Sequence, residues 1–206
     1  MIVAPTFEYL ATPVPFTPAL VPARFGRLPL RDVEQARGTD MPLRLTDLLR
    51  ALDTARGRTV RLARLVPESA LDWRPAPGAY SCADLLRHLA ATERDLFVEV
   101  AMGRPTRYAG HGPALAYGRE GVLAFLDAMH EESMALLETL DDDALDRAVT
   151  TPTGAHLPTW RWLQLLAEHE AHHRGQLYLM LRLLGVETPP LFGMTEEQLV
   201  AKGVSA

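Results

Sequence analysis

Two histidines, His169 and His173, stand four residues apart inside a long apolar stretch of the sequence. Four residues make about one turn of an α-helix, so both imidazoles project from one helical face. That face is otherwise apolar over Trp162–Leu184 and is expected to point into a core. A buried polar ring without a partner costs about 1–3 kcal/mol, so each ring needs something to bind. One divalent cation would satisfy both rings, and hydrogen bonds to a glutamate or tyrosine across the core are the alternative.

The letters around this pair also match His-Glu-x-x-His, the helical motif of zinc proteases. In that motif the two histidines bind zinc and the glutamate, here Glu170, acts as general base. Such proteases take a third ligand downstream, where the carboxylates are Glu187, Glu196 and Glu197. The first follows the expected helix end closely and two prolines precede the others. We therefore expect the third ligand upstream, and no peptidase activity.

A third histidine, His88, lies in a second apolar helical stripe, within Leu85–Leu96. Histidines from two core-facing helices can converge on one cation. Three protein ligands leave one coordination position open for water or substrate, as in catalytic zinc sites. The sequence therefore predicts a metal site formed by His88, His169 and His173, with histidines that hydrogen-bond inside the core as the alternative.

Composition and charge limit the class of protein. With 206 residues, 48% hydrophobic and 23% charged, the chain has the balance of a soluble globular domain. The net charge of −5 argues against a protein built to bind nucleic acid, which needs a basic face. No apolar run approaches the ~18 residues of a membrane span, nothing resembles a signal peptide, and the single cysteine allows no intramolecular disulfide. We expect a cytoplasmic protein that binds neither nucleic acid nor membrane.

The chain divides into an arm and a helical domain. Residues 1–40 contain prolines that forbid a continuous helix, interleaved with apolar side chains. We interpret them as an extended Pro-rich arm, with a disordered leader as the alternative, and residues 41–206 as the metal-binding domain.

Periodic apolar residues predict the helices of this domain. Four long helices are expected near residues 43–66, 81–102, 120–140 and 159–184, a short helix at 195–201, and one strand at 147–150. The predicted fold class is all-α, a four-helix bundle with a Pro-rich N-terminal extension. Metal sites in such bundles are built from side chains on facing helices.

Two segments resemble the DinB/YfiT-like superfamily, which is distinct from the DNA polymerase that shares the DinB name. They are Trp73–Leu89, with WRPAPGAYS followed by LLRHL, and His169–Gln176, with HEAHHRGQ. The resemblance covers residues 43–185 and implies a four-helix bundle, often a homodimer, whose metal ligands match the three histidines named above. Its better-understood members are metal-dependent S-transferases and isomerases that use thiols such as mycothiol, bacillithiol or glutathione. Many other members have no established activity.

Other residues near the histidines are candidates for supporting roles. Arg174 and Gln176 belong to the matching motif and are the candidate substrate-binding residues; Arg174 could anchor the carboxylate of a thiol or pair with Glu170 one turn earlier. Glu170 points about 100° away from His169 around the helix, so it is either a base behind the ligands or a solvent-facing or interhelical ion-pair partner. Cys82, at the start of its helix, is either a thiolate of lowered pKa or a small core residue.

The three histidines and the family resemblance together imply a homodimeric, metal-dependent enzyme that binds zinc or nickel and transfers a low-molecular-weight thiol to an electrophilic small molecule. A divalent cation with an open position can hold a thiol as the reactive thiolate, and it can also activate water. Two alternatives stay open: a metal-dependent hydrolase, and a non-catalytic metal-binding stress or accessory protein. The sequence does not decide which group at the open position is catalytic.

Overall fold

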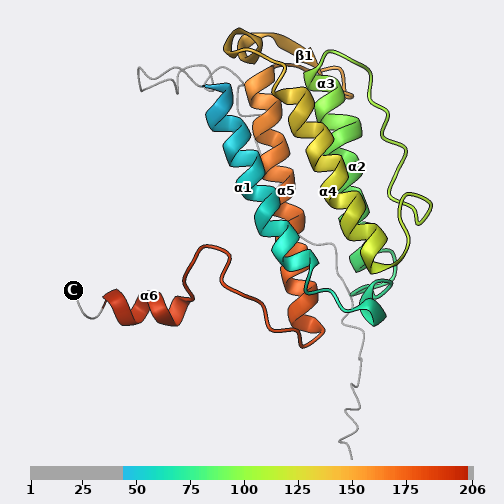
Figure 1. The fold of residues 1–206 in the computed structure, drawn as a ribbon, viewed down its shortest axis with the longest axis vertical. Helices are drawn as coiled ribbons and strands as arrows, with labels where there is room; N and C mark the ends of the chain where they lie inside the picture. The colour runs from blue at the N-terminus through green and yellow to red at the C-terminus, as the bar shows by residue number, and fades with distance from the viewer. Residues whose placement is uncertain (1–43, 204–206) are drawn as a thin grey trace, which may run out of the picture. The chain divides into compact units, whose positions relative to one another are not determined.

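The computed structural model describes residues 44–203 of the chain (Figure 1). The four long helices are α1 (Leu45–Ala63), α2 (Cys82–Thr92), α4 (Gly118–Leu137) and α5 (Thr159–Leu183). A π-helical segment, η4 (Glu93–Val98), and α3 (Glu99–Ala101) continue α2. The short elements are the 3-10 helices η3 (Glu68–Ala70) and η5 (Asp142–Asp146), the strands β1 (Ala148–Thr150) and β2 (His156–Pro158), and α6 (Glu196–Gly203). The predicted arm, residues 1–40, lies outside the described residues. Among residues 44–203 no helix is long and apolar enough to cross a membrane.

Contacts between helix ends define the topology of the bundle. The Asp142 carboxylate, just after α4, accepts a hydrogen bond from the Leu45 backbone at the start of α1. Arg119, at the start of α4, donates to backbone carbonyls at the end of α1. The Trp162 indole, near the start of α5, donates to the carbonyl of Phe97 beyond the end of α2. Helices α1 and α5 therefore run against α2 and α4, and a long loop returns the chain between the parallel pair α2 and α4 (Figure 1).

The observed helices confirm the predicted all-α four-helix bundle. Ser81 caps α2, and its side chain and that of Asp84 form the reciprocal hydrogen bonds of a capping box. Helix α5 begins at Thr159, and Gly185 follows its C-cap Leu184; the φ of 73° at Gly185 is a left-handed conformation that favours glycine. Local sequence signals therefore define both helices that carry the histidines.

Two local features differ from the expectation. Segment η4 interrupts the regular α-helix after Thr92, and β1 pairs with a second strand, with Val149 opposite Leu157. A π-helical segment is rare and has i→i+5 hydrogen bonds, and the apolar periodicity of a single sequence does not predict where one forms. A three-residue strand such as β2 is too short to show an alternating pattern.

The bundle interior contains two apolar clusters, separated by polar side chains. One cluster includes Leu62, Leu89 and Leu177, and the other includes Phe97 and Leu166. The buried polar residues that lie between them along the four helices form what we call the polar layer: Arg56 and Thr59 on α1, Thr92 and Glu93 at the α2–η4 junction, Ser133 on α4, and Glu170, His173 and Arg174 on α5. Because polar groups are costly inside a bundle, this layer is the place to look for a functional site.

Candidate metal centre

Three histidines lie together next to the polar layer, to which His173 belongs. His88 of α2 and His169 and His173 of α5 each present one ring nitrogen, and these nitrogens all lie within 4.8 Å of one another. The Nε2 atoms of His88 and His169 are 3.1 Å apart. The structure therefore brings together the three residues that the sequence indicates as metal ligands, and we call them the histidine cluster.

The hydrogen bonds of His173 leave one of its nitrogens free to bind a cation. Its Nδ1–H donates to Oε1 of Gln176 at 2.7 Å, and the Gln176 amide nitrogen donates to Nε2 of His172 at 3.2 Å. In this orientation of the amide, its oxygen faces His173. The Nε2 atom of His173 therefore keeps its lone pair.

His88 is held in a similar way. Its Nδ1 lies 2.8 Å from the Tyr108 hydroxyl and 3.2 Å from the Thr92 hydroxyl, either of which can accept its proton. The Nε2 lone pair of His88 then faces Nε2 of His169. Two such nitrogens repel at 3.1 Å unless a proton or cation lies between them. Ligands 2.0–2.1 Å from a tetrahedral zinc ion are about 3.4 Å apart, so the spacing fits a shared cation.

Burial keeps the rings of the cluster neutral. Burial and the neighbouring imidazoles lower the pKa of His88 to about 4 and that of His169 to about 3. Burial also lowers the pKa of His173, although the hydrogen bond to Gln176 opposes it. Neutral imidazole is the form that binds metals, and it suits zinc and nickel. The buried Nδ1 of His169 has no hydrogen-bond partner among the described residues.

Aromatic side chains surround the cluster. The Tyr80 ring stacks on His88 with ring centres 5.0 Å apart and meets His173 edge-on at 5.9 Å. His111, in the loop before α4, lies edge-on to Tyr80 at 4.7 Å and to His88 at 5.9 Å. The sequence reasoning missed His111 and Tyr108 because the loop that contains them has no periodic pattern to place them.

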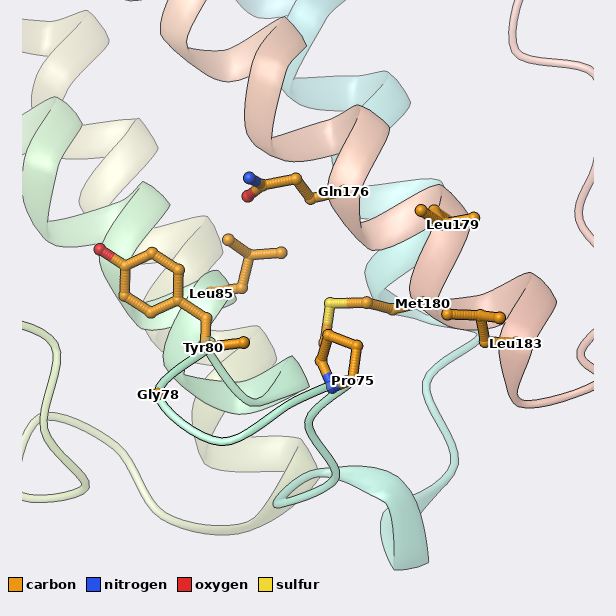
Figure 2. A pocket seen from close by; sticks show the side chains of 9 residues that line it. Pro75, Gly78, Tyr80, Leu85, Gln176, Leu179, Met180 and Leu183 are labelled. Carbon is orange, nitrogen blue, oxygen red and sulfur yellow. The ribbon is translucent and has the colours of Figure 1, made fainter. Parts of the chain in front are cut away.

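A pocket of about 370 Å³ shares residues with the surroundings of the cluster, and Figure 2 shows the side chains that line it. Tyr80 and Gln176, which contact the histidines, also line this pocket. Its other lining residues are Pro75, Gly78, Ala79, Leu85, Leu179, Met180 and Leu183. The cluster therefore lies beside a cavity of the size that binds small molecules.

The polar layer also contains an ion-pair network. The buried guanidinium of Arg56 pairs with the carboxylates of Glu93 and Glu170, the latter at 3.2 Å. His130 of α4 lies 2.8 Å from Glu93. Glu170 is thus an interhelical ion-pair partner, which is one of the two roles that its position in the sequence allowed.

The remaining candidate residues occupy different surroundings. Gln176 contacts the cluster, whereas the buried Arg174 donates to the Ala55 carbonyl of α1 at 3.3 Å and does not line the pocket. Cys82 is fully buried, and burial raises the pKa of its thiol to about 11. It is therefore the small core residue and not a reactive thiolate.

Comparison with known proteins agrees with this fold. YjoA of Bacillus subtilis (strain 168) is 27% identical over 143 residues, which are 66% of this chain and 88% of YjoA. The crystal structure of a DinB-like protein from Bacillus cereus matches with a TM-score of 0.62 and 17% identity, over 73% of this chain and 99% of that one. Bacillus subtilis YfiT, described as a probable metal-dependent hydrolase with an unusual four-helix bundle topology, matches with a TM-score of 0.59 and 20% identity, over 73% and 93% of the two chains. The model of the DinB superfamily matches residues 51–177, and the chain belongs to this superfamily.

Proposed function

We propose that this protein is a metal-dependent enzyme that transfers a low-molecular-weight thiol to an electrophilic small molecule. The observation that carries the proposal is the convergence of three neutral histidines beside an open pocket. His88, His169 and His173 would hold zinc or nickel, and the group of ligand atoms found among the described residues includes no carboxylate. A cation bound there supplies Lewis acidity, which lowers the pKa of a thiol or water at its open position.

The residues around the cluster orient the ligand histidines and provide a place for the electrophile. Gln176 and Tyr108 orient the rings of His173 and His88 through their Nδ1 atoms, and such contacts behind a ligand fix its ring and tautomer. The pocket beside Tyr80 gives the electrophile a place next to the cluster. The thiolate sulfur then forms a bond to the electrophilic carbon while the bond to the leaving group breaks. The leaving group departs with the electron pair, and the thiol proton goes to solvent.

The state of Glu170 favours a thiol over water as the nucleophile. Activating water is harder, because the pKa of water is about 15.7 and that of a free thiol about 8.5. The glutamate that would serve as base in a zinc protease is here paired with Arg56. A thiol loses its proton more readily and needs less help from a general base, so the site suits a thiol better than water as the nucleophile.

A metal-dependent hydrolase is the second candidate. YfiT, which shares this fold, is described as a probable enzyme of that kind, and an open position on a cation can also activate water. The same three histidines would serve both reactions, so only the measured reaction separates them. The homodimer that the family resemblance implies is part of the proposal.

Titration of the cobalt-substituted protein with bacillithiol, mycothiol and glutathione tests the proposal. We expect one of them to give a sulfur-to-metal charge-transfer band and to raise the melting temperature, as a ligand that binds the native state does. The variant His88→Ala should show neither response. If none of the three thiols produces the band or the stabilisation, the transferase proposal fails. Metal-dependent cleavage of p-nitrophenyl esters would then support the hydrolase, and its absence would favour a non-catalytic protein.

A further inference from the structure

We propose that the pocket beside the histidine cluster binds the apolar body of the electrophile, so that the preferred substrate is a neutral aromatic or alkyl molecule without a carboxylate or phosphate. This inference rests on the proposed function, since it assigns the pocket to the electrophile and not to the thiol. It concerns one cavity, which we call the apolar pocket: the space of about 370 Å³ next to Tyr80 and Gln176.

Helix α5, the loop that carries Tyr80, and Leu85 of α2 form the walls of the apolar pocket. Figure 2 shows Gln176, Leu179, Met180 and Leu183 of α5 along one wall, with the loop that carries Tyr80 on the other. Its volume lies within the roughly 300–1,000 Å³ that is usual for small-molecule sites. A compact organic molecule therefore fits into the pocket, whereas a folded polypeptide is too large for it.

The end of the pocket nearest the metal site is defined by two shared residues. Tyr80 stacks on His88, and the side-chain oxygen of Gln176 accepts the hydrogen bond from His173. Both residues also line the apolar pocket. A molecule that fills the pocket therefore places one end next to the histidines, where the thiol would be held.

The charge of the lining determines which molecules fit. None of the nine lining residues is acidic or basic, and the polar side-chain groups among them are the Tyr80 hydroxyl and the Gln176 amide. Arg174 follows the ligand His173 in sequence, but its guanidinium donates to Ala55 on α1. A carboxylate among these lining residues would lose its hydration without gaining an opposite charge from them, which is unfavourable. A neutral body with a polar or electrophilic group at the cluster end meets no such penalty.

Burial along the pocket gives it an inner wall and an outer rim. Leu85 and Met180 are buried, at 0% and 4% exposure, whereas Leu179 and Leu183 are 59% and 60% exposed. The two exposed leucines lie one turn apart on α5, where they flank the opening. An apolar ligand would remove surface of these leucines from water, which favours its binding.

Two probes of similar size test the inference on the full-length protein after the metal has been removed with a chelator, because a bound cation would attract a carboxylate directly. A parallel metal-loaded sample serves to measure bound metal and the thiol band. The probes are 2-phenylethanol and phenylacetate, which share an aromatic body and differ in the charge of the terminal group. We expect 2-phenylethanol to bind about tenfold more tightly, a difference of about 1.4 kcal/mol, as measured by NMR titration. Equal affinities, or tighter binding of phenylacetate, would overturn the inference.

A substitution at the rim locates the binding. Leu179→Lys adds a cation at an exposed position, so the fold is preserved. We expect this substitution to weaken the binding of 2-phenylethanol and to strengthen the binding of phenylacetate. Leu199→Lys is the matched control, because Leu199 on α6 is 58% exposed and does not line the pocket. If Leu179→Lys changes neither affinity, or if Leu199→Lys has the same effect, the probes bind elsewhere and the inference is wrong.

The same samples separate this inference from the proposed function. Bound metal and the thiol charge-transfer band are measured beside probe binding. A protein that keeps both signals but does not prefer the neutral probe refutes the assignment of the pocket alone. Loss of the thiol band refutes the transferase, whatever the probes do.

Discussion

His88 and His173 each have a hydrogen-bond partner behind the ring, and these partners decide which nitrogen faces the cluster. Gln176 fixes His173 from the next turn of the same helix, whereas Tyr108 reaches His88 from a loop. The histidines themselves could be found in the sequence because polar rings at helical spacing interrupt apolar stripes. The partner Tyr108 could not, because the position of a loop residue depends on the folded structure around it.

The first prediction concerns metal affinity. His88→Ala removes one of the three nitrogens of the cluster and should weaken zinc binding by more than about 100-fold, since changing even a residue behind a ligand costs 10–100-fold. His156→Ala is the matched control, because this exposed histidine of β2 pairs with Thr150 and is not one of the three. Competition titration with a chelator measures both affinities. Equal affinities for the two variants would exclude His88 as a ligand.

A second prediction tests the hydrogen bond from the loop. Tyr108→Phe removes the hydroxyl that lies 2.8 Å from Nδ1 of His88, so we expect about tenfold weaker zinc binding. The effect should be smaller than that of His88→Ala because Thr92 still offers a hydroxyl at 3.2 Å. Tyr117→Phe, in the same loop and 89% exposed, should leave the affinity unchanged. An unchanged affinity in Tyr108→Phe would mean that this contact does not support the metal site.

The secondary-structure elements were predicted to different degrees. The capping box of Ser81 and the terminal Gly185 gave the helices of the site nearly correct boundaries, because these are local signals. The π-helical turn after Thr92 and the pairing of Arg56 with Glu93 were not predicted. Both depend on packing between helices, and a single charged residue in a helical pattern is usually at the surface.

The ion-pair network joins α1, α5 and the α2–η4 helix, and its removal should destabilise the bundle. Arg56→Met leaves two carboxylates buried without their cation, which should lower the free energy of unfolding by about 3–5 kcal/mol. Arg50→Met is the control on the same helix; its pair with Asp47 is mostly exposed and should contribute about 0–1 kcal/mol. Urea unfolding followed by circular dichroism measures both. A loss for Arg56→Met no larger than that of the control would show that the network does not hold the helices together.

His130 makes the stability of this network depend on pH. Burial alone would lower the pKa of His130, but the hydrogen bond and charge of Glu93 outweigh it and raise the pKa above 6.5. The folded protein holds this proton more tightly than the unfolded chain. The protonated His130 therefore contributes fully to the free energy of unfolding below pH 6.5, and this contribution is lost as the pH rises through the raised pKa. The stability of the wild type relative to His130→Gln, measured by urea unfolding with a chelator present, should therefore be largest below that pH and decline above it.

A double-mutant cycle assigns this pH dependence to the pair. In a Glu93→Gln background the decline should disappear, since the group that raises the pKa of His130 has lost its charge. A decline of the same size in that background would mean that other groups set the pKa of His130.

At the scale of the whole molecule, the metal site and the apolar core depend on the same helices. His88 lies on α2 and the other two ligands lie on α5, so a bound cation ties these helices together. Cys82, the single cysteine of the chain, begins α2 and has no exposed surface. Its thiol becomes accessible only when α2 opens away from the core, which makes it a reporter of that opening.

The last prediction follows from this coupling. Zinc at about 100 times its dissociation constant stabilises the native state by about 2.7 kcal/mol, which reduces the open population about 100-fold. Alkylation of Cys82 by iodoacetamide, followed by mass spectrometry, should slow by the same factor when reclosing outpaces the reaction. His88→Ala should react at a rate that zinc hardly changes. If zinc binds the wild type but leaves its alkylation rate unchanged, α2 opens around Cys82 without breaking the metal site, and the two helices are not coupled through the histidines.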